Sequence, residues 1–162
     1  MTLRALILAA VSIIADQLTK AWIVAEFALY DRREVLPFFD LVRWHNEGAA
    51  FSFLATAGGW QQWLFIGLGV FFCGFVLYEL RRLPRGDRVM WVVYGLLLGG
   101  AIGNLIDRIS QGYVVDFLAF HFRHAYFPAF NVADASLFCG AALWIWVMIQ
   151  ESRASKAASN DV

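Results

Sequence analysis

The stretch Phe130–Gln150, FNVADASLFCGAALWIWVMIQ, decides the fold. Its uncharged run begins at Ala135 and is slightly shorter than the about 20 apolar residues that a membrane-crossing helix needs. A helix that crosses comfortably must therefore begin near Asn131, which puts Asp134 in its first turn, near the membrane interface. Because a charged side chain at membrane depth costs several kcal/mol, Asp134 is a candidate functional residue.

The rest of the chain has the composition of a membrane protein. Of its 162 residues, 60% are hydrophobic and 16% charged, whereas a soluble domain carries about 45–50% and about 25%. We predict an all-α membrane protein with one integral domain, residues 1–152, and a polar, disordered cytoplasmic tail, 153–162. Asp16 interrupts a signal-peptide pattern, so the first segment is expected to be a retained helix. The four predicted spans are about 3–25, 62–80, 89–108 and 131–150.

The distribution of arginines predicts the orientation. The short connection between the second and third spans carries four, Arg81, Arg82, Arg85 and Arg88, which places it and both termini in the cytoplasm. Two longer loops, about 26–62 and 107–130, then face outward. Each contains a stretch rich in β-branched and aromatic residues, Phe38–Trp44 and Val114–Phe122. We expect these stretches to form a small β-rich cradle on the outer membrane surface, because unpaired strands cannot lie in hydrocarbon.

With this topology the polar residues of the spans gather in one outer layer. Asp16 and Lys20 are four apart in the first span and share a helix face. The third span ends with three polar residues spaced on one face, and the following loop and the start of the fourth span add more. The members of the layer after Lys20 are Asn104, Asp107, Arg108, Asp116, Asn131 and Asp134.

Each of these residues also has a structural interpretation. Asp16 and Lys20 form either an ion pair that fixes helix packing or a substrate contact, and Asp107 with Arg108 could hold the loop. Asn131 suits a helix N-cap, and Asp134 suits the positive end of a helix dipole. Three glycines of the third span, Gly95, Gly99 and Gly103, are spaced by four and predict a face for close helix packing.

Other chemistries find little support. Cys73 and Cys139 lie in apolar runs and are expected to be small buried residues. The histidines, His45, His121 and His124, lack the spacing of a zinc site, and the serines lack a paired base, so we expect no metal and no cofactor. Lys plus Arg equals Asp plus Glu, which gives no reason to expect nucleic acid. A small transporter or a membrane scaffold remains the alternative, although a transporter would carry its acids near the midplane.

Five short motifs in order resemble the lipoprotein signal peptidase (signal peptidase II) family over essentially the whole chain. Each is weak alone, but their order and their match to a four-span layout make the resemblance specific. They are Asp16–Lys20 (DQLTK), Asn46–Ser52 (NEGAAFS), Gly99–Arg108 (GGAIGNLIDR), Val115–Phe117 (VDF) and Phe130–Asp134 (FNVAD).

This resemblance implies an aspartic endopeptidase of the bacterial inner membrane. Such an enzyme removes the signal peptide of diacylglyceryl-modified prolipoproteins by cutting just before the lipidated cysteine. It is the target of globomycin, and we expect a monomer. Asp116 and Asp134 match the catalytic pair, and Gly99, Gly103 and Asp107 lie in a structural motif beside it. The residues that match the substrate-binding or orienting set are Asp16, Lys20, Asn46, Asn104, Arg108 and Asn131. We also expect residues 46–53 and 117–130 to close over the site.

Overall fold

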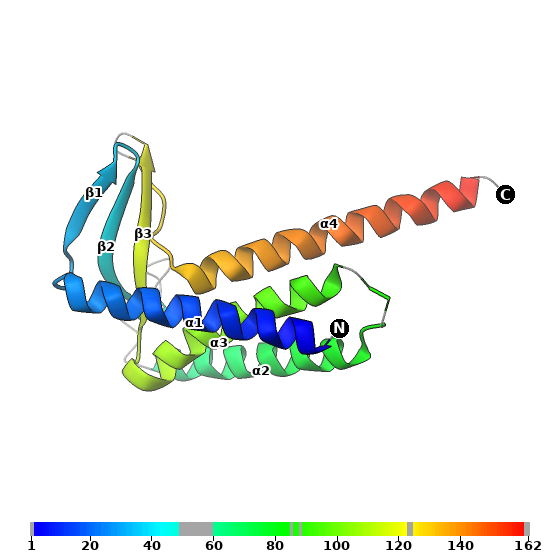
Figure 1. Ribbon diagram of the computed structural model, residues 1–162, viewed down its shortest axis with the longest axis horizontal. Helices are drawn as coiled ribbons and strands as arrows, with labels where there is room; N and C mark the ends of the chain where they lie inside the picture. Colours follow the sequence, from blue (N-terminus) through cyan, green and yellow to red (C-terminus); the bar gives the residue numbers. More distant parts are fainter. Residues whose placement is uncertain (1, 49–59, 85, 88, 123–124, 161–162) are drawn as a thin grey trace.

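The computed structural model describes residues 2–48, 60–84, 86–87, 89–122 and 125–160 (Figure 1). The part of the second motif after Gly48 lies outside these residues. Residues 49–53 of the segment that we expect to close over the site lie outside them as well. Arg85, Arg88 and His124 also lie outside them. The elements in chain order are α1 (Thr2–Glu26), β1 (Arg32–Leu36), β2 (Phe39–Asn46), α2 (Trp60–Arg82), α3 (Met90–Gln111), β3 (Val114–Phe122), β4 (Ala125–Tyr126) and α4 (Val132–Asn160).

Four helices of the described chain are long and apolar enough to cross a membrane, which confirms the predicted fold class. Helix α3 is the central one and packs against the other three. Of its most apolar 18-residue stretch, 67% is buried within the protein, against 11% for α2. Burial of this kind explains why α3 carries the glycines, because a helix with neighbours on several sides needs small residues at its contacts.

The glycine face of α3 packs against α1, as the spacing predicted. A Cβ atom on Gly95 would lie 2.9 Å from the carbonyl oxygen of Ala5. On Gly99 it would lie 2.6 Å from the Cβ atom of Ser12. Both distances are too short for a real side chain, so glycine sets the separation between the two helices.

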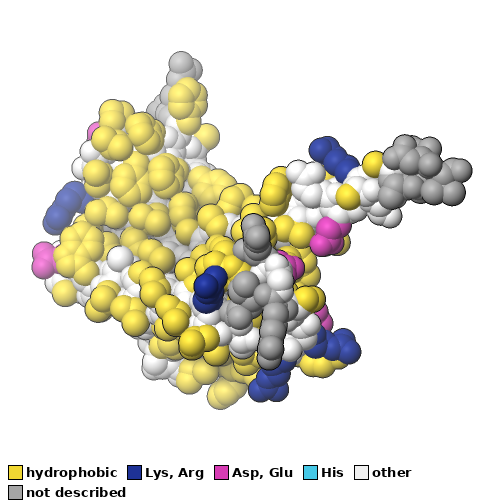
Figure 2. Space-filling view, turned by 45° about the vertical axis from the view of Figure 1, so that its right-hand side comes forward, with side chains coloured by type: hydrophobic (Ala, Val, Ile, Leu, Met, Phe, Trp, Pro, Cys, Tyr) yellow, Lys and Arg dark blue, Asp and Glu magenta, His cyan; other side chains and the backbone are white. Residues whose placement is uncertain are grey.

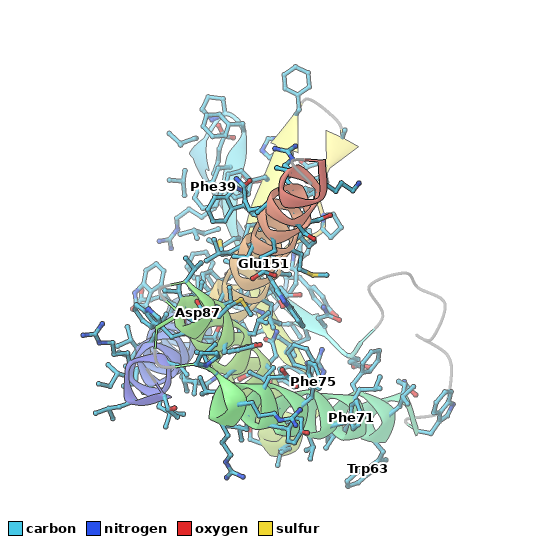
Figure 3. The ribbon with its side chains drawn as sticks, turned by 90° about the vertical axis from the view of Figure 1, so that its right-hand side faces the viewer. Phe39, Trp63, Phe71, Phe75, Asp87 and Glu151 are labelled. Carbon is cyan, nitrogen blue, oxygen red and sulfur yellow. The ribbon has the colours of Figure 1, made fainter. Side chains whose placement is uncertain are left out.

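The outer surface of the helices is apolar. Figure 2 shows many hydrophobic side chains over the visible face, with few charged ones among them. On α2, the Trp63 and Phe71 side chains are 72% and 76% exposed and lie on the outside of the bundle (Figure 3). A soluble protein rarely exposes so continuous an apolar surface, so this surface fits a lipid environment.

The strands form one antiparallel sheet of order β1-β2-β3-β4. The sheet lies at one end of the bundle and both chain termini lie towards the other (Figure 1). Strands β2 and β3 confirm the two predicted strand stretches, with Trp44 opposite Asp116 and Asn46 opposite Val114. Strand β1 was not predicted. All five of its residues are exposed. Its polar first residues are typical of a loop, and only the pairing with β2 makes this segment a strand.

The ends of α3 and α4 position the candidate site. Helix α3 ends at Gln111, and its C-cap Gly112, with a φ of 85°, turns the chain into β3. Helix α4 begins at Val132, one residue after Asn131, and continues to Asn160. The expectation of a disordered tail is therefore wrong up to Asn160. The residues after Gln150 include neither proline nor glycine, so nothing in them stops the helix.

Candidate active site

Two carboxylates meet where the sheet joins the helices. Asp116 comes from β3 and Asp134 from the first turn of α4. Asn131 contacts both of them. Its Nδ2 donates to Asp116 Oδ1 at 2.7 Å, and its backbone N–H donates to Asp134 Oδ2 at 3.3 Å. The structure therefore brings together the two aspartates that lie eighteen positions apart in the sequence.

Asn131 is also the N-cap that the sequence predicted. Its Oδ1 accepts the N–H of Asp134 at 2.9 Å, while Asp134 accepts the N–H of Asn131. This reciprocal arrangement is a capping box with aspartate in place of the usual glutamate. The capping and site interpretations of Asn131 are thus compatible, because one side-chain oxygen caps the helix and the amide nitrogen reaches Asp116.

The other two asparagines also present an amide to the carboxylates. Asn46 Nδ2 donates to Asp116 Oδ2 at 3.0 Å, while its Oδ1 accepts the N–H of Gly48 at 2.9 Å. Asn104 Nδ2 donates to Asp134 Oδ1 at 2.6 Å, and its Oδ1 accepts from Lys20 Nζ at 3.1 Å. In each asparagine the side-chain oxygen accepts a hydrogen bond, which leaves the NH2 group to donate to a carboxylate. These bonds fix the orientation of both amides.

A buried ion cluster lies behind the pair. Lys20 Nζ is 2.8 Å from Asp16 Oδ2 and 2.9 Å from Asp107 Oδ2, and all three side chains are at most 4% exposed. Asp16 Oδ1 accepts the N–H of Ala133 at 2.8 Å, and Asp107 Oδ2 accepts the N–H of Val115 at 3.3 Å. The cluster thus holds the backbone immediately before each candidate catalytic aspartate.

Asp16 and Lys20 form the ion pair that their spacing predicted. Their other polar contacts include Asp107 and Asn104 for Lys20, and the N–H of Ala133 for Asp16. Asp107 pairs with Lys20 rather than with Arg108. The Arg108 side chain instead lies over the Phe65 ring at 5.4 Å and donates to the carbonyl oxygen of Asn104 at 3.4 Å.

Gln17 is a member of this layer that the sequence analysis did not single out. Its Nε2 donates to Asp107 Oδ1 at 3.0 Å, to Asp16 Oδ2 at 3.2 Å and to the Gly103 carbonyl at 3.2 Å. The only signal for it was its place inside the first motif, since an isolated glutamine beside Asp16 carries little weight. Gly103 is close-packed here, and a Cβ on it would lie 2.8 Å from Asp16 Oδ2.

The surroundings of Asp116 suit a carboxyl group that keeps its proton near neutral pH. Burial raises the pKa of Asp116 to about 7, and the charge of Asp134 acts in the same direction. The amides of Asn46 and Asn131 and the charge of Lys20 oppose this rise in pKa. Two carboxyl groups in such a relation hold one proton between them over a range of pH.

The remaining candidates lie elsewhere. His45 stacks on Tyr113 with ring centroids 3.7 Å apart, and His121 contacts Asp40 at 3.3 Å in the sheet. Across the described ranges, no three His, Cys, Asp or Glu side chains are grouped as metal ligands. Cys73 is buried as expected, but Cys139 is exposed on α4, so the prediction of burial is wrong for this residue.

Comparison with known proteins shows which family the chain belongs to. The family model described as signal peptidase (SPase) II matches residues 8–150. The chain belongs to the signal peptidase II family. It is 47% identical to the lipoprotein signal peptidase of Shewanella amazonensis, over 89% of this chain and 84% of the relative. It is 41% identical to that of Alteromonas mediterranea, over 98% of this chain and 93% of the relative.

Solved structures show the same fold. A bacterial membrane enzyme determined by the in meso method at 2.3 Å resolution superposes with a TM-score of 0.82 at 32% identity, over 91% of this chain and 88% of that one. A second, at 1.9 Å, gives 0.78 at 31% identity, over 89% and 91%. Membership of the signal peptidase II family makes the chain an aspartic-type peptidase and a multi-pass bacterial membrane protein.

Proposed function

We propose that this signal peptidase II cleaves diacylglyceryl-modified prolipoproteins on the N-terminal side of the lipidated cysteine, with Asp116 and Asp134 as the catalytic pair. The observation that carries the proposal is the placement of Asn131, which donates to both carboxylates from the start of α4. A residue that only capped the helix would have no need to reach Asp116.

The chemistry requires one proton shared between two carboxyl groups. The ionised aspartate takes a proton from a water molecule, and the protonated one donates to the scissile carbonyl oxygen. The water oxygen attacks the carbonyl carbon to give a neutral gem-diol. The gem-diol then collapses as the leaving amine is protonated and the C–N bond breaks. The pair titrates as a unit, so the proposal assigns the base role to the pair rather than to one residue.

The neighbouring residues divide into three proposed roles. Asn46, Asn104 and Asn131 orient the carboxylates through their amides. Arg108 is half-buried and lies next to Asn104, which suits a cation that binds the substrate backbone. The other residues of this group have a structural role: they hold the start of β3 and the start of α4 in place. They are Asp16, Lys20, Asp107, Gly99 and Gly103.

The proposed orientation puts the site on the extracytoplasmic side of the membrane. It is supported by the arginine-rich α2–α3 connection and by the location of both termini at the end of the bundle away from the sheet. At that interface water reaches the carboxylates while a signal helix stays in the bilayer. We also propose that the enzyme acts as a monomer and that globomycin-type inhibitors occupy the same site.

The test is processing of a diacylglyceryl prolipoprotein by purified protein in detergent. Asp116→Asn and Asp134→Asn are each expected to lower the cleavage rate by a factor on the order of 10³–10⁴, because each removes one acid–base partner. Glu47→Gln is the matched control, since Glu47 is an exposed carboxylate one residue from Asn46. Full activity of either aspartate variant would refute the proposed pair, and loss of activity with a chelator would point to a metal.

A further inference from the structure

An apolar groove begins at Asp134 and follows the outer surface of α4. Its volume is about 380 Å³. It lies between the first turns of the helix and the segment that precedes it. Of its six lining residues, Asp134 is the one that carries a charge. The lining consists of Phe127, Phe130, Asp134, Ala135, Phe138 and Cys139.

One wall of this groove is fixed by the sheet. The Phe127 and Phe130 rings meet edge to face at 6.1 Å, and Phe130 stacks on Phe120 at 5.9 Å. Backbone bonds hold the same residues, since the N–H of Phe130 donates to the Leu118 carbonyl at 3.0 Å and the N–H of Phe127 to the Phe120 carbonyl at 2.9 Å. The aromatic wall is therefore in place before any ligand binds.

The other wall is open towards the surroundings of the bundle. Phe138 is 74% exposed, and Cys139 is exposed beside it. Both belong to α4, of whose most apolar 18-residue stretch only 17% is buried within the protein. A groove with this position is entered from the bilayer and ends at a catalytic carboxylate.

We infer that this groove binds one acyl chain of the lipidated cysteine. The inference rests on the proposed function, because the substrate supplies the chain. The cysteine follows the scissile bond directly, and its glyceryl ester starts a few bonds from the peptide backbone. A chain that starts there must run along an apolar path leading away from the catalytic pair, and the groove on α4 is such a path.

The size and lining of the groove argue against the signal helix as its occupant. An α-helix with its side chains is about 10–12 Å across, so two turns of one occupy about 1,000 Å³. The groove has about 380 Å³, which is within the about 300–1,000 Å³ of small-molecule pockets. Its lining also lacks partners for an extended peptide backbone, which would leave buried N–H and C=O groups unsatisfied.

The first experiment measures cleavage as a function of acyl length. Purified enzyme is given otherwise identical lipopeptides that carry lauroyl or palmitoyl chains. Ala135→Phe and Cys139→Trp fill the groove and are expected to lower the palmitoyl-to-lauroyl ratio of kcat/KM by at least about tenfold, since one misplaced methylene in a pocket already changes rates by about tenfold or more. The control is Ala21→Phe, at an exposed position of α1, which is expected to leave the ratio unchanged.

The second experiment probes Cys139 directly and does not depend on turnover. In an Asp116→Asn, Cys73→Ala background, the rate of Cys139 alkylation by a maleimide is measured with and without lipopeptide. We expect at least about tenfold protection by the palmitoylated peptide. Equal protection by the same peptide without acyl chains, or by phospholipid alone, would overturn the inference by assigning the groove to the signal peptide or to bulk lipid.

These outcomes separate the groove from the proposed function. If Asp116→Asn abolishes cleavage but the groove variants keep the wild-type length preference, the acyl site is wrong and the peptidase proposal stands. If Ala135→Phe is inactive with both acyl chains, Cys139→Trp and the alkylation assay still decide whether the groove binds an acyl chain. Inactivity of the wild-type protein towards both lipopeptides would count against the proposed function, while the alkylation assay would still test whether the groove binds an acyl chain.

Discussion

Two pairs of aspartates lie in the same layer of this protein and are held in different ways. Asp16 and Asp107 share the ammonium group of Lys20, with N–O distances of 2.8 Å and 2.9 Å. Asp116 and Asp134 are held instead by the neutral amides of Asn46, Asn104 and Asn131. All four carboxyl groups are largely removed from solvent, so the partner rather than the burial distinguishes the two pairs.

The difference shows how one buried layer can be both rigid and reactive. A lysine between two carboxylates supplies a full positive charge, and its two ion pairs make the cluster a fixed support. An amide donates a hydrogen bond but adds no net charge. Burial therefore raises the pKa of Asp116 to about 7, although the amides of Asn46 and Asn131 oppose this rise. Each pair can be tested by changing the partner that defines it.

Removing the cation has the largest expected effect. Lys20→Met leaves two buried carboxylates without a counter-charge and is expected to destabilise the protein by about 3–5 kcal/mol. It also frees the oxygen of Asn104, so cleavage is expected to fall with stability. Thermal unfolding in detergent and the processing assay are the measurements.

Two further variants make the Lys20 prediction specific. Ser12→Ala removes a buried hydrogen bond between α1 and α4, Ser12 Oγ to Ser136 Oγ at 3.2 Å, and is expected to change stability by only about 1 kcal/mol. The double change Lys20→Met, Asp107→Asn is expected to recover part of the loss, because one uncompensated charge is gone. A Lys20→Met protein as stable as Ser12→Ala would mean that the ion cluster is not a support.

Adding a methyl group between the ion cluster and α4 is expected to have an intermediate effect on stability. A methyl group on Gly103 would lie 2.8 Å from Asp16 Oδ2 and 3.1 Å from the Cβ of Ala133. Gly103→Ala is therefore expected to destabilise by about 1–3 kcal/mol. Gly74→Ala on α2 is the matched control, because its Cβ would have nothing within 4 Å. The control is expected to be neutral or slightly stabilising through helix propensity, and equal losses in both would contradict this account.

Changing the amide partner of Asp116 has the smallest effect and acts on pH dependence. Because Asp116 titrates near 7 with Asp134 charged, kcat/KM is expected to fall as pH rises through about 7, where the pair loses its shared proton. The Asn46 amide lowers the pKa of Asp116, so Asn46→Ala is expected to move this alkaline limb to higher pH, with a rate loss within about tenfold at the optimum. An unmoved limb would exclude Asn46 as a partner of the titrating pair.

The same shift predicts how stability depends on pH. The pKa of Asp116 is higher in the folded protein than in the unfolded chain, where it is near its ordinary value of 3.8. Between these values the folded state binds more protons, so the contribution of this group to stability falls as pH rises from about 4 to about 7. The midpoint of thermal unfolding is expected to fall over that range, and to fall less in Asp116→Asn.

The sequence predicted the spans and the membership of the polar layer more accurately than its internal contacts. Hydropathy and the length of the fourth apolar run placed Asp134 in a first helical turn, as α4 has it. The spacing of Asp16 and Lys20 indicated their pairing. Neither signal contains the rotation of α1 against α3, which brings Lys20 to Asp107 and Gln17 into the same contact.

The misses have physical reasons of the same kind. Strand β1 exists because its neighbour pairs with it, while its own exposed residues give no strand pattern. Cys139 lies in an apolar run, which predicts removal from water, but in a membrane helix such a run can also face lipid. Local sequence reports the preference of a residue for an apolar environment and not which apolar environment it finds.

The bond from the N–H of Ala133 to Asp16 has a consequence for biosynthesis. It joins the first helix of the chain to the last, and Asp116 comes from a strand between them. A ribosome makes these parts in order, so the nascent chain lacks one aspartate of the proposed catalytic pair until the fourth helix is made and packs beside the first. On the proposed function, a chain truncated before α4 is an inactive peptidase.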